Sequence, residues 1–455
     1  MARWDLRQRL VMLVMLFTFA LGMLAMLHGA PVSGASTMYT ADFTALLITI
    51  GLLAMIFIGA YLFPKWIGAD PLLMTMMNFL CSLGVLVQYS ISRGSGLYHA
   101  LWYAIGSILM VVVSLAVRRV KTLRRWWPHL AILAAMLLIA PLFNTVNGAH
   151  AHIPIQRVTD AVTGRSIITL SIQPSEGVKI LLIILLADML SGHSWRPDSV
   201  WAMGFAVMCV GLLIAEDDLG TCVLYAMTAL LMFFAATGSF TLLFTGVAGG
   251  AGSAWLVYQN TGKFRTRVEQ WLNPFMRVMD DKGGVGLKGY QIAESLMALA
   301  AGGVHGLGYG IRDTFRWVPE YSNDFVFSVV CSQFGAVFAL AVLAVYVVIL
   351  FRGMRIAQRA RRRFHALLAI GVTALIGFQT FVIVGGVVNM FPLTGVTMPF
   401  ISQGGSSMLS CMMLMGILNG VYACADQDEQ DARAILGQYS AVRSTFIWTT
   451  REVGG

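Results

Sequence analysis

Two carboxylates stand where a polar segment gives way to an apolar one. The stretch WVPEYSNDFVF, residues 317–327, places Glu320 and Asp324 four residues apart, with Asn323 beside them. A carboxylate half-buried at such a boundary has its pKa raised by desolvation, which suits a general base. The alternative is a helix N-cap, because Ser-Asn-Asp before an apolar run is a typical capping sequence. On position alone, the cap is the favoured interpretation.

A second charged pair occurs in SIQPSEGVK, residues 171–179. Pro174 suits the first position of a helix, and Glu176 then falls in the first helical turn. Lys179 lies on the same face, at the helix end whose dipole disfavours a cation. An outward-facing ion pair or an anion site accounts for both residues, whereas dipole complementation accounts for Glu176 alone.

Two further stretches carry polar groups next to apolar segments. AEDDLGT, residues 215–221, has three acids that include Asp218, and a solvated hairpin tip is as good an explanation as a functional site. In FPLTGVTMPFISQGGSS, residues 391–407, Ser402 is predicted to cap the following helix, and Gly404 and Gly405 allow a backbone or ligand to approach. Free amides at that helix start suit an anion such as a phosphate; packing through small residues is the alternative.

Other common sites are not indicated. The sequence contains no P-loop, H-E-x-x-H or G-x-S-x-G motif, and the glycine-rich GVHGLGYG at 303–310 follows no predicted strand. The six cysteines lack C-x-x-C spacing and lie in or beside apolar blocks, so they are interpreted as small buried hydrophobic residues.

The elements that position these groups are membrane helices. Of 455 residues, 58% are hydrophobic and 12% charged, and the mean hydropathy is +0.75. Soluble domains have about 25% charged residues. The long apolar blocks predict an all-α integral membrane protein with about twelve spans. They lie near residues 11–28, 43–63, 72–90, 99–117, 128–143, 177–190, 199–214, 219–235, 240–257, 326–351, 366–390 and 405–424.

Charge distribution predicts the orientation of these spans. With a cytoplasmic N-terminus, basic clusters such as Arg118–Arg119 and Arg361–Arg363 face the cytoplasm, while the short outer loops hold only Arg93, Arg157 and Arg165. Both termini are then cytoplasmic. The net charge of +9 therefore reflects topology and does not indicate nucleic acid binding.

One long segment, 258–325, falls on the outside, where loops of this length usually serve a function. It contains FRTRVEQWLNPFMRV, suited to the membrane interface, and YQIAESLMALAAGG, which is too short to span and is interpreted as re-entrant. The first apolar segment is interpreted as a retained helix in preference to a cleaved signal peptide. The tail 426–455 is predicted to be a solvated cytoplasmic segment, and disorder is one option for it.

These stretches, taken in order, resemble the SEDS family of bacterial cell-wall membrane proteins, which includes FtsW, RodA and SpoVE. The matching segments are QPSEGVK, DLGT, GYQIAESLMALAAGGVHGLGYG, VPEYSNDFVF and PLTGVTMPFISQGGSSML. The resemblance implies a ten-helix core, here 64–425, preceded by two extra N-terminal helices in 1–63. It further implies a glycosyltransferase in the bacterial plasma membrane that polymerises lipid II on the outer face, with a class B penicillin-binding protein as partner.

On that resemblance Asp324 takes the place of the family's essential aspartate and acts as general base. The residues assigned to substrate binding are Glu176, Lys179, Asp218, Tyr290, Gln291, Glu320, Asn323, Ser402, Gly404, Gly405, Ser406 and Ser407. The pyrophosphate leaving group calls for cations, helix N-termini or a divalent metal such as Mg²⁺ or Mn²⁺. Lys179 and the SQGGSS helix start are the candidates, with arginines of the long loop in reserve. No residue is assigned as a metal ligand, and no organic cofactor or nucleic acid is expected; the other partners are membrane lipids.

The chain also departs from the family pattern. Ser322 and Asn323 replace a histidine and a threonine, Glu216 and Asp217 replace Gln-Pro, and NGAHAHIPI lacks the usual Arg and Trp. These departures keep two other functions open. One is a lipid II flippase, and the other is a non-catalytic scaffold that recruits the transpeptidase.

Overall fold

The structure is a computed structural model that describes residues 6–28, 43–120, 126–143, 153–159, 166–192, 197–279 and 285–452. Arg165, one of the three basic residues of the short outer loops, lies outside these ranges. Most of the NGAHAHIPI segment lies outside them as well.

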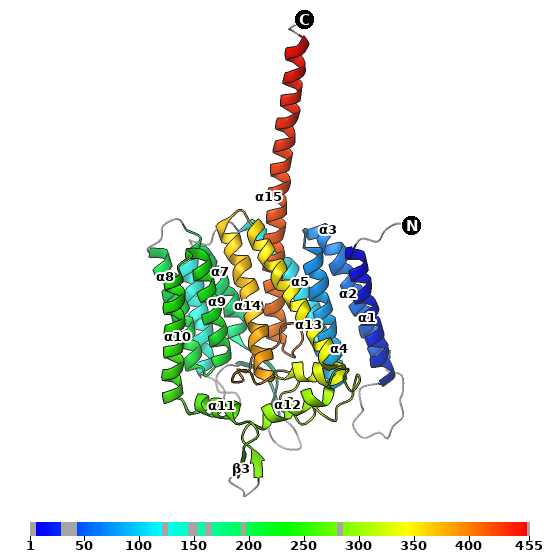
Figure 1. Cartoon of the computed structure of the whole chain (residues 1–455), viewed down its shortest axis with the longest axis vertical. Coiled ribbons are helices and arrows are strands. Elements are labelled where there is room, and N and C mark those ends of the chain that lie inside the picture. Colours follow the sequence, from blue (N-terminus) through cyan, green and yellow to red (C-terminus); the bar gives the residue numbers. More distant parts are fainter. Residues whose placement is uncertain are drawn as a thin grey trace.

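The described chain is a bundle of long helices (Figure 1). Its helices are α1 (Leu6–His28), α2 (Phe43–Phe57), η1 (Ile58–Leu62), α3 (Phe63–Ile67), α4 (Pro71–Ile91), α5 (Arg93–Arg119), α6 (Trp127–Ile139), η2 (Ala140–Phe143), α7 (Pro174–Leu190), α8 (Pro197–Ala215), α9 (Leu219–Thr237), α10 (Phe240–Asn260), α11 (Gly262–Leu272), α12 (Tyr290–Gly302), α13 (Val326–Arg359), α14 (Arg363–Val387) and α15 (Gly405–Glu452).

Ten of the described helices are long and apolar enough to cross a membrane. The shorter α6, with η2, and the 17-residue α7 fall at the other two predicted spans. Every apolar block of the sequence therefore forms a helix at its expected place, and the prediction of an all-α, multi-pass membrane protein is confirmed. Two small antiparallel hairpins, β1 (Ile153–Thr159) with β2 (Ser166–Ile172) and β3 (Arg277–Met279) with β4 (Val285–Leu287), add to the bundle.

The two N-terminal helices pack against the rest of the bundle. Leu21 and Ala25 of α1 are buried in the main hydrophobic core. The Phe17 ring lies 5.6 Å from that of Phe79 on α4 and 5.4 Å from that of Phe338 on α13. Aromatic pairs at such distances stabilise a helix contact beyond the area they bury.

The two ends of the bundle differ. The start of α1 and the C-terminal half of α15 lie at one end, and α11, α12 and the β3 hairpin lie at the other (Figure 1). The segment predicted to be solvated after residue 426 continues as helix to Glu452 and extends beyond the bundle. All the candidate residues of the sequence analysis lie on elements or turns that meet at the α11 and α12 end, which we call the loop end.

Helix α13 is broken near its start. Gly335 has φ 82° and ψ 170°, so residues 326–334 form a short helix of their own. A break leaves backbone groups without helical partners, and these need other partners inside a membrane. The glycine-rich stretch after α12 supplies them: Leu307 N donates to Ser332 O (2.9 Å), and Ala336 N donates to Gly303 O (2.9 Å). That stretch therefore holds the helix that follows Asp324.

Candidate active site

The turn before α13 holds Asp324. The helix begins at Val326, and Phe325 occupies the cap position without any side-chain capping bond, so the capping interpretation of Asp324 is wrong. The Asp324 side chain is half-buried. Burial, with the nearby Glu320 carboxylate, raises the pKa of Asp324 from 3.8 to about 7, while Arg267 opposes the rise. A carboxyl with that pKa accepts a proton readily at neutral pH.

Glu320 shapes this turn with its backbone and its side chain. It has a positive φ of 54°, and its carbonyl accepts from Asn323 N (3.0 Å) and Asp324 N (3.1 Å). Its carboxylate accepts from Asn323 Nδ2 (2.8 Å). Phe325 is fully buried directly after the turn. The turn is thus anchored in the core on one side and closed by its own hydrogen bonds on the other.

The segment before α15 is hydrogen-bonded to the same turn. Ser402 Oγ donates to Asn323 O (2.6 Å) and accepts from Met398 N (2.7 Å), and Gln403 N donates to Ser322 O (2.9 Å). The Ser402 hydroxyl is therefore committed to the turn, and its predicted role as the cap of α15 is corrected. Because these bonds use the backbone carbonyls of Ser322 and Asn323, the departure of both side chains from the family pattern leaves them intact.

Residues 394 and 395 lie between the Asp324 turn and the first turn of α9. Gly395 has φ +73°, and a Cβ there would lie 3.5 Å from Asp324 Oδ2. A Cβ on Gly220, in the first turn of α9, would lie only 2.4 Å from Thr394 O. The absence of side chains at these two positions lets the segment pass between Asp324 and the start of α9, which follows Asp218.

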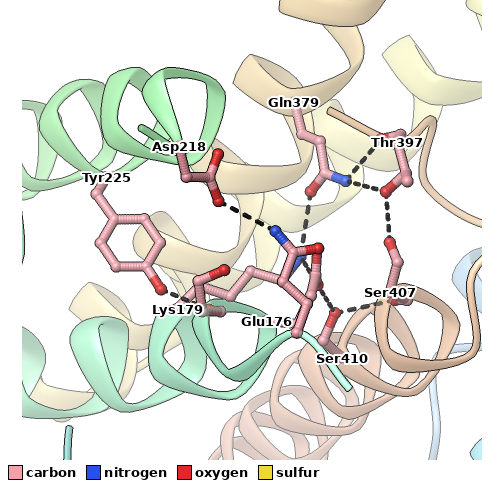
Figure 2. A network of polar contacts seen from close by, with 10 residues as sticks. Glu176, Lys179, Asp218, Tyr225, Gln379, Thr397, Ser407 and Ser410 are labelled. Carbon is pink, nitrogen blue, oxygen red and sulfur yellow. Dashed lines mark hydrogen bonds and ion pairs between the residues drawn. The ribbon is translucent and has the colours of Figure 1, made fainter. Parts of the chain in front are cut away.

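A buried polar network links α7, α14 and α15 (Figure 2). Lys179 and Glu176 form the predicted ion pair, with side-chain exposures of 3% and 12%, so the pair is buried in the bundle instead of facing outward. Lys179 Nζ also donates to Gln379 Oε1 of α14 (3.4 Å), and Ser410 Oγ of α15 donates to Glu176. The charge of Lys179 is therefore matched within the protein.

The network extends in two directions (Figure 2). Gln379 Nε2 donates to Thr397 O (2.7 Å), and Thr397 Oγ1 shares a hydrogen bond with Ser407 Oγ (2.6 Å). On the other side, Gln173 Nε2 donates to Asp218 Oδ2 (3.0 Å). Side chains from the stretches around Glu176, Asp218 and Ser407, which lie far apart in the sequence, therefore meet at one place.

The turn between α8 and α9 is not a solvated tip. Asp218 caps α9 by accepting from Thr221 N (3.1 Å). Glu216 is 1% exposed, and its Oε1 has no hydrogen-bond partner among the residues that the structure describes. Burial, together with Asp218, raises the pKa of Glu216 to about 8. The solvated interpretation is thus wrong for Glu216, whose raised pKa favours the neutral carboxylic acid at pH 7.

The remaining predicted residues are placed differently. Tyr290 and Gln291 are exposed on the first turn of α12, where Tyr290 contacts Glu294. A Cβ on Gly405 would lie 2.6 Å from the ring of Trp102, so its open space is filled by α5. Gly404 and Ser406 are half-buried at the start of α15. No side-chain hydrogen bond between described residues links these five positions to the turn or the network. Gly404 nevertheless lies beside the network, because a Cβ there would lie 3.4 Å from Ser407 Cβ and 3.9 Å from Thr397 Cγ2.

Sequence reasoning missed the groups that connect the predicted ones. Gln379 links Lys179 to Thr397, and Gln88 Nε2 donates to Ser322 O (2.9 Å) and Ile401 O (3.1 Å). Gln379 is the one amide side chain of α14, and Gln88 shares α4 with Asn78; amides within largely apolar spans are the signal that would have found them. Among the described residues, no group of three or more His, Cys, Asp or Glu side chains is arranged to hold a metal ion.

Comparison with known proteins agrees with this arrangement. Residues 70–426 match the family model of the FtsW, RodA and SpoVE cell cycle proteins. Stage V sporulation protein E of Bacillus subtilis (strain 168) is 30% identical over 377 residues, 78% of this chain and 98% of the relative. The peptidoglycan glycosyltransferase RodA of Mycobacterium tuberculosis (strain ATCC 25618 / H37Rv) is 30% identical over 385 residues, 77% of each chain.

Solved structures share the fold. A chain from a study of the structural coordination of polymerization and crosslinking by a peptidoglycan synthase complex aligns with a TM-score of 0.61 and 23% identity, over 78% of this chain and 98% of that one. The rod shape-determining protein RodA of Thermus thermophilus aligns with a TM-score of 0.54 and 22% identity, over 79% and 98%.

Proposed function

The chain belongs to the FtsW, RodA and SpoVE family of membrane proteins, and on this premise we propose that it is a peptidoglycan glycosyltransferase that polymerises lipid II. The observation that carries the proposal is Asp324, a half-buried carboxyl with a pKa of about 7, in a turn fixed by the segment that also reaches the buried network. A group that must accept a proton from a sugar hydroxyl near neutral pH needs these properties.

In the proposed reaction the 4-hydroxyl oxygen of the acceptor sugar attacks the anomeric carbon of the donor. The bond from that carbon to the pyrophosphate oxygen breaks, and the lipid pyrophosphate leaves with the bonding electrons, which inverts the configuration. Asp324 takes the hydroxyl proton as the new bond forms. Glu320 and Asn323 hold the turn, so they act by positioning Asp324.

The anionic leaving group requires stabilisation that Lys179 is poorly placed to give directly. Its ammonium group is buried and paired with Glu176, which supports a structural role in holding α7, α14 and α15 together. The start of α15, with Gly404 and Ser406, offers backbone amides. Magnesium is commonly bound by one or two carboxylates together with substrate phosphates, so a divalent cation remains a proposed additional aid.

We further propose that the loop end faces the outside of the plasma membrane and that both termini are cytoplasmic. The arginines at the end of α5, Arg118–Arg119, and before and at the start of α14, Arg361–Arg363, support this orientation. A class B penicillin-binding protein is the proposed partner, because a solved relative of the same fold comes from a complex that couples polymerization to crosslinking.

Purified protein, alone and with a class B penicillin-binding protein, tests the proposal when it is incubated with fluorescent lipid II and the products are separated by gel electrophoresis. The proposal predicts a ladder of glycan strands. Movement of lipid II across vesicle membranes without polymer formation would favour the flippase. An inert protein that still binds its partner would favour the scaffold.

A further inference from the structure

Helix α11 is fixed against the end of α14 at the loop end. Trp271 Nε1 donates to Asn389 O (3.2 Å), and Asn389 Nδ2 donates back to Trp271 O (3.2 Å). The segment directly after α11 is also bonded to the residue before α12, because Gly289 N donates to Pro274 O (3.2 Å). The side chains of α11 therefore have defined positions relative to the bundle.

The charged residues of α11 lie on two faces. Arg265 and Glu269 pair one turn apart (3.2 Å), and Glu269 also pairs with Lys288 (2.8 Å). The Arg265 side chain is 66% exposed. Arg267 lies four residues before Trp271, so it shares the face of α11 that contacts Asn389. Arg265, Glu269 and Lys288 thus form a charge-matched cluster on one face of α11, and Arg267 lies on another face.

The Arg267 guanidinium is unpaired within the described part of the chain. Its side chain is half-buried, and it makes no hydrogen bond or ion pair with any residue in the described ranges. Its positive charge nevertheless reaches Asp324, whose pKa it lowers against the effects of burial and Glu320. No nitrogen of Arg267 comes within 4.0 Å of an Asp324 oxygen, so no ion pair between the two groups neutralises either charge.

We propose that Arg267 binds the diphosphate of the donor substrate beside Asp324, an inference that rests on the proposed function. A guanidinium group presents a planar fork of donors that matches two phosphate oxygens, and it keeps its charge at any relevant pH. As the bond between the anomeric carbon and oxygen breaks, negative charge grows on the leaving diphosphate, and a fixed cation stabilises that state. Lys179, Arg265 and Lys288 already have carboxylate partners.

The test compares Arg267→Gln with the matched control Arg265→Gln, whose arginine lies on the solvent face of the same helix. We expect Arg267→Gln to lower kcat/KM for lipid II about 30-fold or more, the loss typical of a charged hydrogen bond, and Arg265→Gln to change it less than twofold. Arg267→Lys keeps the charge and loses the fork, so its activity should lie between those of the wild-type protein and Arg267→Gln.

Two further readouts separate ligand binding from a merely structural role. Inhibition of the wild-type protein by undecaprenyl pyrophosphate should weaken at least tenfold in Arg267→Gln and Arg267→Lys, and inhibition should be unchanged in Arg265→Gln. Loss of the Arg267 charge should also move the acid limb of the pH–rate profile to higher pH, because the pKa of Asp324 rises. Arg267→Lys should leave that limb in place.

Failure of this inference is distinguishable from failure of the proposed function. If the wild-type protein and Arg265→Gln form no glycan strands, the proposed function fails. If they form strands and Arg267→Gln matches both in kcat/KM and in inhibition, the role of Arg267 is overturned. If Arg267→Gln does not fold, Arg267→Lys decides: a kcat/KM and an inhibition by undecaprenyl pyrophosphate equal to those of the wild-type protein would overturn the role of Arg267.

Discussion

Replacement of Glu320 by Gln probes how the protein sets the basicity of Asp324. The pKa of Asp324 rises from 3.8 to about 7, first through burial and then through Glu320. A rise of about three units corresponds to ~4 kcal/mol. Because burial is the larger cause and Glu320 is itself exposed, solvent screening limits its share, and we expect Glu320→Gln to lower the pKa by about half a unit to one unit.

The sign of the effect follows from the role of the base. Asp324 must be deprotonated to accept a proton, so a lower pKa extends activity to lower pH. At pH 6 the deprotonated fraction, and with it the relative rate, should increase about three- to fivefold. Glutamine still offers an oxygen to Asn323 Nδ2, so the turn should keep its hydrogen bond.

The assay is the initial rate of glycan-strand formation from lipid II between pH 5 and 9, with each profile normalised to its maximum. Glu269→Gln is the matched control, because that carboxylate lies on α11 and pairs with Lys288 and Arg265. Its acid limb should coincide with that of the wild-type protein. An acid limb of Glu320→Gln that is unmoved, or that moves to higher pH, would refute the reasoning.

Three other substitutions test the frame of the site. Glu216→Gln should raise the free energy of unfolding at pH 8 by up to ~4 kcal/mol and leave it nearly unchanged at pH 4.5. The reason is that a carboxyl whose pKa is raised to about 8 in the folded state destabilises the protein progressively as the pH rises from 4.5 to 8. Gly335→Ala, which places a Cβ 2.3 Å from a backbone oxygen at φ +82°, should lower the melting temperature in detergent strongly, whereas Gly249→Ala, with open space around it, should not. Lys179→Met alone should lower the free energy of unfolding by about 3–5 kcal/mol, because it leaves the Glu176 carboxylate buried without its partner. The double variant Lys179→Met, Glu176→Gln should recover part of that stability, and equal losses in the single and double variants would contradict a buried ion pair.

The sequence predicted the spans because each long apolar block has few alternatives in a membrane. It predicted the Glu176–Lys179 pair because three residues along a helix bring side chains to one face. It also placed Asp324 at the boundary of a span. These predictions depend on local spacing alone, and the structure bears out each of them.

Contacts between distant segments were beyond such reasoning. Ser402 was predicted to cap its own helix, but it bonds to the carbonyl of Asn323, which is 79 positions away. The break at Gly335 has no local signal, because its missing hydrogen bonds are supplied by the glycine-rich stretch after α12. Arg267 is one of several basic residues of a predicted interface helix in the sequence; it is distinguished from Arg265 by the fixed position of α11 and by the pairing of Arg265 with Glu269.

The most direct test of the account is the rate at which purified Asp324→Asn protein forms glycan strands from lipid II. Asparagine keeps the size of the side chain and removes its ability to accept the proton. Because the protein carries this carboxyl with a raised pKa, the variant should fold and melt at the wild-type temperature or above it. The account predicts a rate about 10²- to 10⁴-fold below that of the wild-type protein. A well-folded variant that polymerises lipid II within tenfold of the wild-type rate would contradict it.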